Sequence, residues 1–351
     1  MPNEFNKKYQ AKHLAKIKAE QQKIKKGYLD AIEKIYQKAT GIKLKGDTFR
    51  ISDYPALSNE IDKQLLSFSS KVDITLHNGI KDQWELSIKK NVEIIHKKYG
   101  EKNVSEAVNK VLYDPQEKAL EVFQARKVNG FTLSDRVLKY TGQMRGQIEQ
   151  NVFAGLSEGR SAAAMARDQV AYMENPEPLF RRVRDAKGNL KLSKAAEKYY
   201  DDLGKPGRGV YRSPYKNFMR ITRDTINSSY READMVRYQS LPFVLGYKVS
   251  LSNNHPKFDV CDSLAGIYPK TFKWRAWHVL CMCNCVAELP SPEEYDKYEQ
   301  AILNGTADGY KFKDEIKQVP DNLNSYIEKN KGMMDNWKRK PDWITENNLK
   351  I

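Results

Sequence analysis

The sequence feature that most constrains the fold is a long amphipathic pattern between residues 61 and 95. Its apolar positions recur every three or four residues: Ile61, Leu65, Phe68, Val72, Leu76, Ile80, Trp84, Ile88 and Ile95. This spacing follows the 3.6-residue period of an α-helix, with Gly79 as its interruption. The pattern predicts one long helix, bent at Gly79. Its apolar face must pack either inside a helical bundle or against a neighbouring subunit.

A second helix is predicted from Lys7 to Ala39, in a strongly basic segment. Residues 1–50 hold thirteen Lys/Arg against five Asp/Glu, an excess of eight in a chain whose net charge is +15. Such a segment is typical of a basic arm that contacts nucleic acid, and it equally fits a solvated helix face. On the first interpretation, the phosphate contacts are Lys7, Lys8, Lys12, Lys16, Lys23, Lys25 and Lys26.

The middle of the chain predicts a helical hairpin. Thr132 and Asp135 have the spacing of a capping box before a helix that runs to Gly155, and Ser161 can cap an alanine-rich helix after a short turn. Residues 174–212 hold three prolines and four glycines, which predicts an irregular insertion.

A third helix and a strand are predicted after this insertion. Ser213 and Pro214 open the helix, which stops near Pro242. The segment 246–252 alternates apolar and polar residues, as a strand does.

His, Asp and Cys residues are concentrated between residues 255 and 285. All four cysteines of the chain lie in this stretch. Zinc prefers four nitrogen or sulfur ligands. In many zinc sites, one ligand is separated in the sequence from a group of closely spaced ligands. The spacing predicts a zinc site with Cys261, His278, Cys281 and Cys283 as ligands, and Cys285 or His255 as alternates.

A structural zinc site is the favoured interpretation of this cluster. A catalytic zinc site is a second interpretation. In a third, the cysteines are small buried hydrophobes with reduced thiols and His278 is a hydrogen-bonded core residue. The short Cys-x-Cys-x-Cys run beside a histidine favours metal ligation over simple packing.

These residues resemble the end of the phage Mu F-like minor head (head morphogenesis) family. That family has an aspartate and cysteine, then a glycine, then an H-P-x-C-x-C box, matched here by Asp259, Cys261, Gly266, His278, Cys281 and Cys283. The helix from Arg220 resembles the family's R-x-x-R-T-E helix, with matches at Arg220, Arg223, Tyr230 and Ala233. Three departures are Val279 in place of the box proline, Thr225 beside Asp224 at the acidic position, and the additional Cys285.

The resemblance implies a structural virion component that is not an enzyme. It would be made in the host cytoplasm and join the head near the portal, as an oligomer. Its partners would be the portal, other head proteins and packaged DNA. Together with the basic N-terminal segment and the turn at Asn129-Gly130, the resemblance predicts three regions: a basic helical N-terminal region (1–130), a Mu F-like domain (131–290) and a polar C-terminal extension (291–351). The expected fold is mainly α with a small α+β portion: elongated N-terminal helices, a helical hairpin and a C-terminal strand-loop metal knot.

Two other functions are compatible with the sequence. A zinc-dependent nuclease would use His255, Asp259 and His278, although a complete thiolate set would close the metal's coordination shell. A nucleic-acid-binding protein would use Trp274, Arg275 and Trp277 for base stacking and phosphate contacts, although such tryptophans more often cover a small core. No apolar run approaches the roughly 20 residues that span a bilayer, so no membrane contact is expected.

Overall fold

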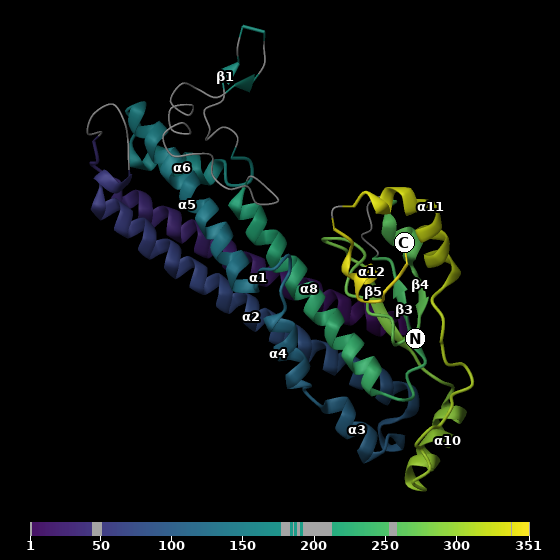
Figure 1. Cartoon of the computed structure of the whole chain (residues 1–351). Helices are drawn as coiled ribbons and strands as arrows, with labels where there is room; N and C mark the ends of the chain where they lie inside the picture. Colours follow the sequence, from purple (N-terminus) through teal and green to yellow (C-terminus); the bar gives the residue numbers. More distant parts are fainter. Residues whose placement is uncertain are drawn as a thin grey trace. The chain divides into compact units, whose positions relative to one another are not determined.

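The computed structural model describes residues 2–43, 51–176, 213–252, 258–337 and 339–350, with short pieces at 183–184, 186–187 and 190–191. Helices dominate these residues (Figure 1). The fold class predicted from the sequence, mainly α with a small α+β portion, is confirmed. No helix in these ranges is both long enough and apolar enough to cross a membrane.

The elements follow one another in a simple order. The helices are α1 (Pro2–Lys38), α2 (Pro55–Tyr99), α3 (Glu106–Tyr113), α4 (Glu117–Ala125), α5 (Leu133–Ser157), α6 (Ala162–Ala171), α8 (Pro214–Ser240), α9 (Val260–Leu264), α10 (Pro292–Leu303), α11 (Asp321–Asp335) and α12 (Asp342–Thr345). The strands are β1 (Val183–Arg184), β2 (Leu190–Lys191), β3 (Gly246–Ser250), β4 (Gly266–Tyr268) and β5 (Asn284–Glu288).

The chain divides into two compact units, each made of separated segments. The cysteine unit comprises residues 1–17, 79–124 and 224–351, and the helical unit comprises residues 18–78 and 125–223. These units do not coincide with the three consecutive regions expected from the sequence. The reason is that the boundaries fall inside α1, α2 and α8, so segments far apart in the sequence share one unit.

The long helix predicted from the amphipathic pattern is confirmed: α2 is a single helix that continues through Gly79. Of the apolar positions that predicted it, Ile88 is half-buried and the others are buried. In the helical unit, the ring of Phe68 on α2 packs edge-on against Tyr28 of α1 and Phe218 of α8, with centroids 5.7 and 5.1 Å apart. These contacts place α2 at the centre of that unit's core.

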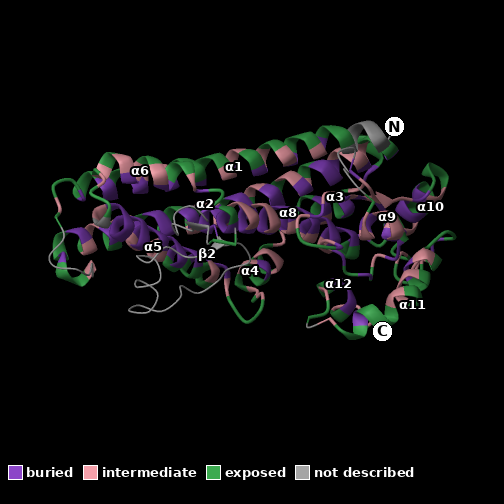
Figure 2. Ribbon diagram, turned by 90° about the horizontal axis from the view of Figure 1, so that it is seen from above, coloured by how far each residue is buried: buried purple, intermediate pink, exposed green. Residues whose placement is uncertain are grey.

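Helix α1 is a packed helix and not a separate basic arm. From Tyr9 onward, every third or fourth residue of α1 is buried, including His13, Ile17 and Ile24. Figure 2 shows buried and exposed positions alternating along α1. The basic residues occupy the exposed positions because the apolar residues between them pack into the core, a division that a charge count does not detect.

The predicted hairpin of the helical unit is formed by α5 and α6. Thr132 and Asp135 make the capping box, with Asp135 N–H donating to Thr132 Oγ1 at 3.2 Å, and Ser161 caps α6. The two helices approach closely where Gly155 faces the buried Met165. A Cβ atom at position 155 would lie 2.3 Å from Met165 Sδ, closer than atoms can pack.

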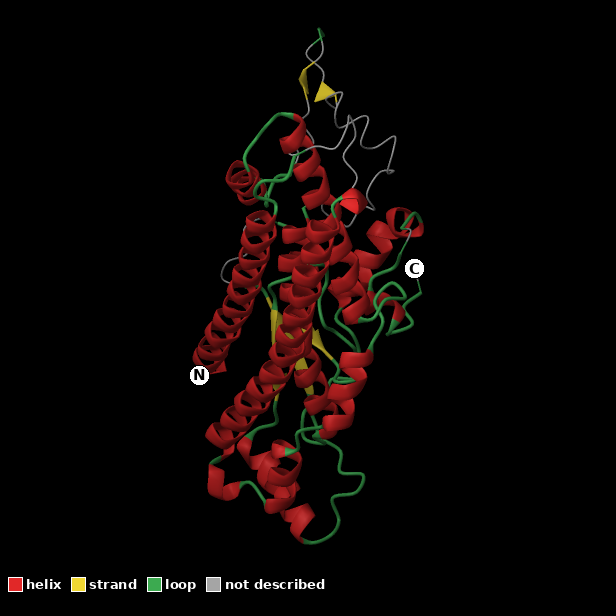
Figure 3. Cartoon of the chain, turned by 90° about the vertical axis from the view of Figure 1, so that its left-hand side faces the viewer, coloured by secondary structure: helices red, strands yellow, loops and turns green. Residues whose placement is uncertain are grey.

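The cysteine unit contains an antiparallel sheet of order β4-β3-β5. Its strands are drawn in yellow in Figure 3. Tyr247 and Val249 of β3 are buried, as the alternating strand pattern predicted. Residues from α10, α11 and α12 belong to the same core, so residues 291–351 are not merely a polar extension. Their apolar residues are sparse but well spaced, and the buried ones are Tyr295, Tyr298, Phe312, Leu323, Met334, Trp343 and Ile344.

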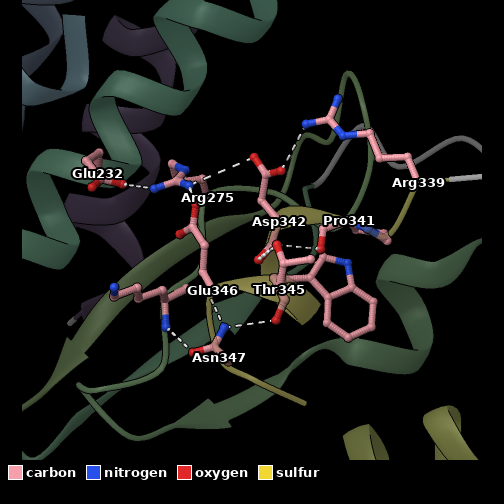
Figure 4. A network of polar contacts seen from close by, with 10 residues as sticks. Glu232, Arg275, Arg339, Pro341, Asp342, Thr345, Glu346 and Asn347 are labelled. Atoms are coloured by element: carbon pink, nitrogen blue, oxygen red, sulfur yellow. Dashed lines mark hydrogen bonds and ion pairs between the residues drawn. The ribbon is translucent and has the colours of Figure 1, made fainter. Parts of the chain in front are cut away.

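A polar network ties the C-terminal residues to the segment before the cysteines (Figure 4). Arg275 forms ion pairs with Glu232 of α8, at 2.8 Å, and with Glu346. The side-chain amide of Asn347 pairs with both backbone polar groups of Lys273, accepting at 2.7 Å and donating at 2.9 Å. Trp343 donates its indole N–H to the carbonyl of Trp277 at 3.1 Å. These bonds hold residues 273–277 in place.

Two glycines of α5 test the close approach in the hairpin. Gly155→Ala should destabilise the protein by about 1–3 kcal/mol, because Met165 must move in a filled core. Gly142→Ala is the matched control: Gly142 is exposed, a Cβ there meets nothing within 4 Å, and the change should stabilise the helix by up to about 1 kcal/mol. Thermal denaturation midpoints measure both, and equal midpoints for the two variants would contradict the packing.

Candidate metal centre

Three buried cysteines come together in the cysteine unit. We call Cys261, Cys281 and Cys283 the cysteine cluster; their sulfur atoms lie within 4.8 Å of one another, and each residue is at most 2% exposed. The Sγ atoms of Cys261 and Cys281 are 3.7 Å apart. A tetrahedral zinc ion with Zn–S bonds of about 2.3 Å separates its sulfur ligands by about 3.8 Å. The cluster therefore has the composition and spacing to bind a metal ion.

Local structure places each cysteine. Asp259 begins α9 with a capping box, its carboxylate accepting the N–H of Cys261 at 2.6 Å, so Cys261 sits in the first turn of the helix. Cys281 follows a turn closed by its N–H to the carbonyl of His278, at 3.2 Å. Leu280 in this turn has a φ of 64°, a left-handed conformation that is unfavourable for a residue with a side chain.

His278 lies at the edge of the cluster. Its Nε2 is 3.1 Å from Cys261 Sγ and 3.3 Å from Asp259 Oδ2, and its side chain is 37% exposed. Its Nδ1 is 2.7 Å from the carbonyl oxygen of Val279. A metal-binding histidine usually donates its second ring N–H to such a carbonyl. Asp259, Cys261 and His278 form a second group that could hold a metal ion, with Cys261 common to both groups.

The thiols of the cluster strongly affect one another's protonation. Hydrogen bonds from Cys261 and Cys283 lower the pKa of Cys281 well below its usual value, and the same contact with Cys281 raises the pKa of Cys261. One thiolate is therefore favoured over three, because adjacent negative sulfurs repel. A metal ion removes this limit, since a coordinating thiol is deprotonated outright.

Helix α8 holds the backbone of residues 275–283, which we call the cysteine segment. Asp224, Asn227 and Arg231 lie at positions i, i+3 and i+7, on one face of the helix. The N–H of Leu280 donates to Asp224 Oδ1 at 2.9 Å, and Asn227 Nδ2 donates to the carbonyl of Cys281 at 2.8 Å. Sequence reasoning missed these roles, although polar residues at helical spacing inside a motif helix were a signal for them.

Arg231 makes the largest set of these contacts. Its guanidinium donates to the carbonyl oxygens of Arg275 (2.6 Å), Cys281 (2.9 Å) and Cys283, and lies 4.8 Å from the ring centre of Trp274. Arg231 is 2% exposed. A buried arginine with this geometry fixes the relative positions of three separate carbonyl groups.

The structure does not bring the alternate ligand Cys285 into the cluster. The Sγ of Cys285 lies 3.6 Å from Asp234 Oδ2, and burial raises the pKa of its thiol. Cys285 belongs to β5, where it pairs with Val249 of β3, so the sheet decides its surroundings. His255 lies outside the described residues.

A buried polar group beside Cys285 was not predicted at all. Asp234 forms an ion pair with Lys90, accepts from Ser87 at 2.6 Å and accepts from Asn91 at 2.8 Å. Lys90 and Asp234 are each about 1% exposed. These residues lie on α2 and α8, and no sequence signal had paired the two helices in this register.

The lysines considered for nucleic-acid contact lie along α1. Three form ion pairs: Lys8 with Glu93 at 2.6 Å, Lys16 with Asp82 at 2.5 Å and Lys23 with Glu20 at 2.9 Å. The other four are exposed: Lys7, Lys12, Lys25 and Lys26. Trp274 and Trp277, in contrast, are 1% and 2% exposed, so they belong to the core and cannot stack on bases.

Comparison of this chain with protein-family models, with curated proteins and with solved structures finds no match. The resemblance to the Mu F-like family therefore depends on the motif residues of this chain themselves. The structural facts that bear on function are the cysteine cluster, its support by α8 and the exposed lysines of α1.

Proposed function

We propose that this chain is a phage or prophage minor head protein of the Mu F-like type, a structural component of the virion. One observation carries the proposal: two motifs that resemble the family, far apart in the sequence, contact each other in the cysteine unit. Asn227 and Arg231, from the motif helix, bind the carbonyl groups of Cys281 and Cys283, from the motif box. This contact between the second half of the motif helix and the motif box is what a shared fold element would produce, and it supports the proposal.

The metal in this proposal is a structural zinc ion. Cys261, Cys281 and Cys283 would supply three sulfur ligands. His278, whose Nε2 lies 3.1 Å from Cys261 Sγ, would supply the fourth. Four protein ligands fill a tetrahedral shell, so no water would be activated at neutral pH. A closed site supplies folding free energy and no hydrolysis, which favours a structural subunit over an enzyme.

Cysteine substitutions test the zinc site. Purified wild-type protein should contain about one zinc ion per chain, and Cys281→Ser should lose it and melt at a lower temperature. Cys285→Ser is the matched control, because Cys285 is equally buried but contacts Asp234 outside the cluster; it should keep the metal. Metal analysis and thermal melting measure both effects. A zinc-free wild type that folds normally, or metal loss from both variants alike, would refute the site.

A nuclease is the competing function, favoured by the exposure of His278 and Asp259, whose side chains are 37% and 39% exposed. The same purified protein, incubated with DNA or RNA and with zinc or magnesium, distinguishes the two. A structural protein should cleave neither substrate. Cleavage by the wild type that Asp259→Asn abolishes, with fold and zinc retained, would replace the structural proposal with a nuclease.

Head assembly is the direct test of the proposed function. The gene should lie beside portal or terminase genes. When the chain is co-expressed with the neighbouring portal and major capsid proteins, it should co-sediment with procapsids in a few copies each. Cys281→Ser should not enter procapsids, whereas Cys285→Ser should. If the wild type stays with free protein in the sedimentation profile, the proposal fails.

Contact with packaged DNA is part of the proposal and depends on the exposed lysines of α1. Changing Lys7, Lys12, Lys25 and Lys26 together to Gln should weaken DNA binding and reduce its salt dependence, by a slope of roughly 0.9 for each phosphate that is no longer neutralised. The matched control changes four exposed lysines on other segments: Lys102, Lys118, Lys329 and Lys331. Salt-dependent gel shifts compare the three proteins. Equal slopes in both variants would show that α1 does not contact DNA.

A further inference from the structure

Arg231 differs from the other buried or half-buried cations around the cysteine cluster. Lys90 pairs with Asp234, and Arg275 pairs with Glu232 and Glu346. The contacts of Arg231 are to carbonyl oxygens and to the Trp274 ring, and it forms no ion pair with a carboxylate among the described residues. A buried charge is costly to remove from water, so a negative group close to Arg231 would stabilise it beyond what its carbonyl hydrogen bonds provide.

The cysteine cluster supplies that partner when a metal binds. A divalent ion with three thiolates and one neutral imidazole carries one net negative charge. Two of the three carbonyl groups that Arg231 binds belong to Cys281 and Cys283, so the guanidinium lies on the backbone that carries these sulfurs. The charge of Arg231 and that of the loaded site are equal and opposite.

We propose that Arg231 is the positioning residue and counter-charge of the metal site. Its planar guanidinium holds the segments of residues 275 and 281–283 at the spacing that the metal requires, and its charge offsets that of the thiolate-bound ion. This inference rests on the metal site of the proposed function, and it adds a residue that the ligand set and the family motif do not include.

Arg237 offers a matched control on the same helix. It is also buried, and its guanidinium also donates to backbone carbonyls, those of Val111 and Asp114. These acceptors belong to the α3 region and not to the cysteine segment. Substitution of Arg237 therefore removes a buried arginine and its backbone contacts while leaving the metal site's own support intact.

The experiment measures metal affinity in purified wild type, Arg231→Met, Arg231→Lys, Arg237→Met and Arg237→Lys. Cobalt(II) and zinc are titrated in competition with a chromophoric chelator at one fixed pH, and the cobalt absorption bands report tetrahedral thiolate ligation. Arg231→Met should weaken binding about 10–100-fold while saturating cobalt still gives the tetrahedral spectrum. Arg231→Lys should weaken binding less, since it keeps the charge but cannot reach three carbonyls. The Arg237 variants should lower the melting temperature and leave metal affinity unchanged.

Three results would overturn the inference: wild-type affinity in both Arg231 variants, equal weakening by the Arg237 variants, or a wild type that binds neither metal. If Arg231→Met fails to fold, the comparison of Arg231→Lys with Arg237→Lys decides the matter, and equal affinities refute the role. Entry into procapsids is measured separately. Normal head assembly with unaltered metal affinity in the Arg231 variants would reject this inference alone, and failure of the wild type to enter procapsids would reject the head function alone.

Discussion

The docking of the cysteine segment onto one polar face of α8 is the interaction on which the cysteine unit depends. Asp224, Asn227, Arg231 and Asp234 follow one another on that face, and the last three are buried. Charged groups removed from water are stable only when their hydrogen bonds are satisfied, which makes their partners obligatory. The backbone of residues 275–283 provides carbonyl and amide partners for the first three, and α2 provides Ser87, Lys90 and Asn91 for Asp234.

This arrangement explains why the cluster has the geometry to hold a metal ion. The ligands come from α9 and from the segment before β5, which are joined by loops and have little regular structure of their own. Backbone contacts with α8 and the C-terminal network around Arg275 hold these segments before any metal binds. A metal ion would bind to a site organised in this way without first ordering its ligands, and the ion would permit the deprotonation of all three thiols that their mutual repulsion opposes.

In α1 and in the C-terminal segment, the positions of the buried residues decide how the chain packs. Helix α1 keeps its lysines in solvent because Tyr9, His13 and Ile17 lie on its buried side, and burial lowers the pKa of His13 to about 4, so that its ring is neutral at physiological pH. The segment beyond residue 290 adds few apolar side chains, yet Trp343 and Ile344 reach the same core as the cysteines. A basic composition and a polar tail therefore coexist with well-packed buried residues, because the position of each apolar residue matters more than the average.

The sequence by itself determined the helices with long periodic patterns, the Thr132–Asp135 capping box, the strand at β3 and the grouping of Cys261, Cys281 and Cys283. These features depend on local spacing, which the order of residues contains directly. The tertiary structure decided the register of α2 against α8 and the pairing of Lys90 with Asp234. It also decided the place of Arg231 and the separation of Cys285 from the cluster. They depend on which segments pack together across long stretches of chain, and buried polar groups accept only the partners that this packing brings within hydrogen-bonding distance.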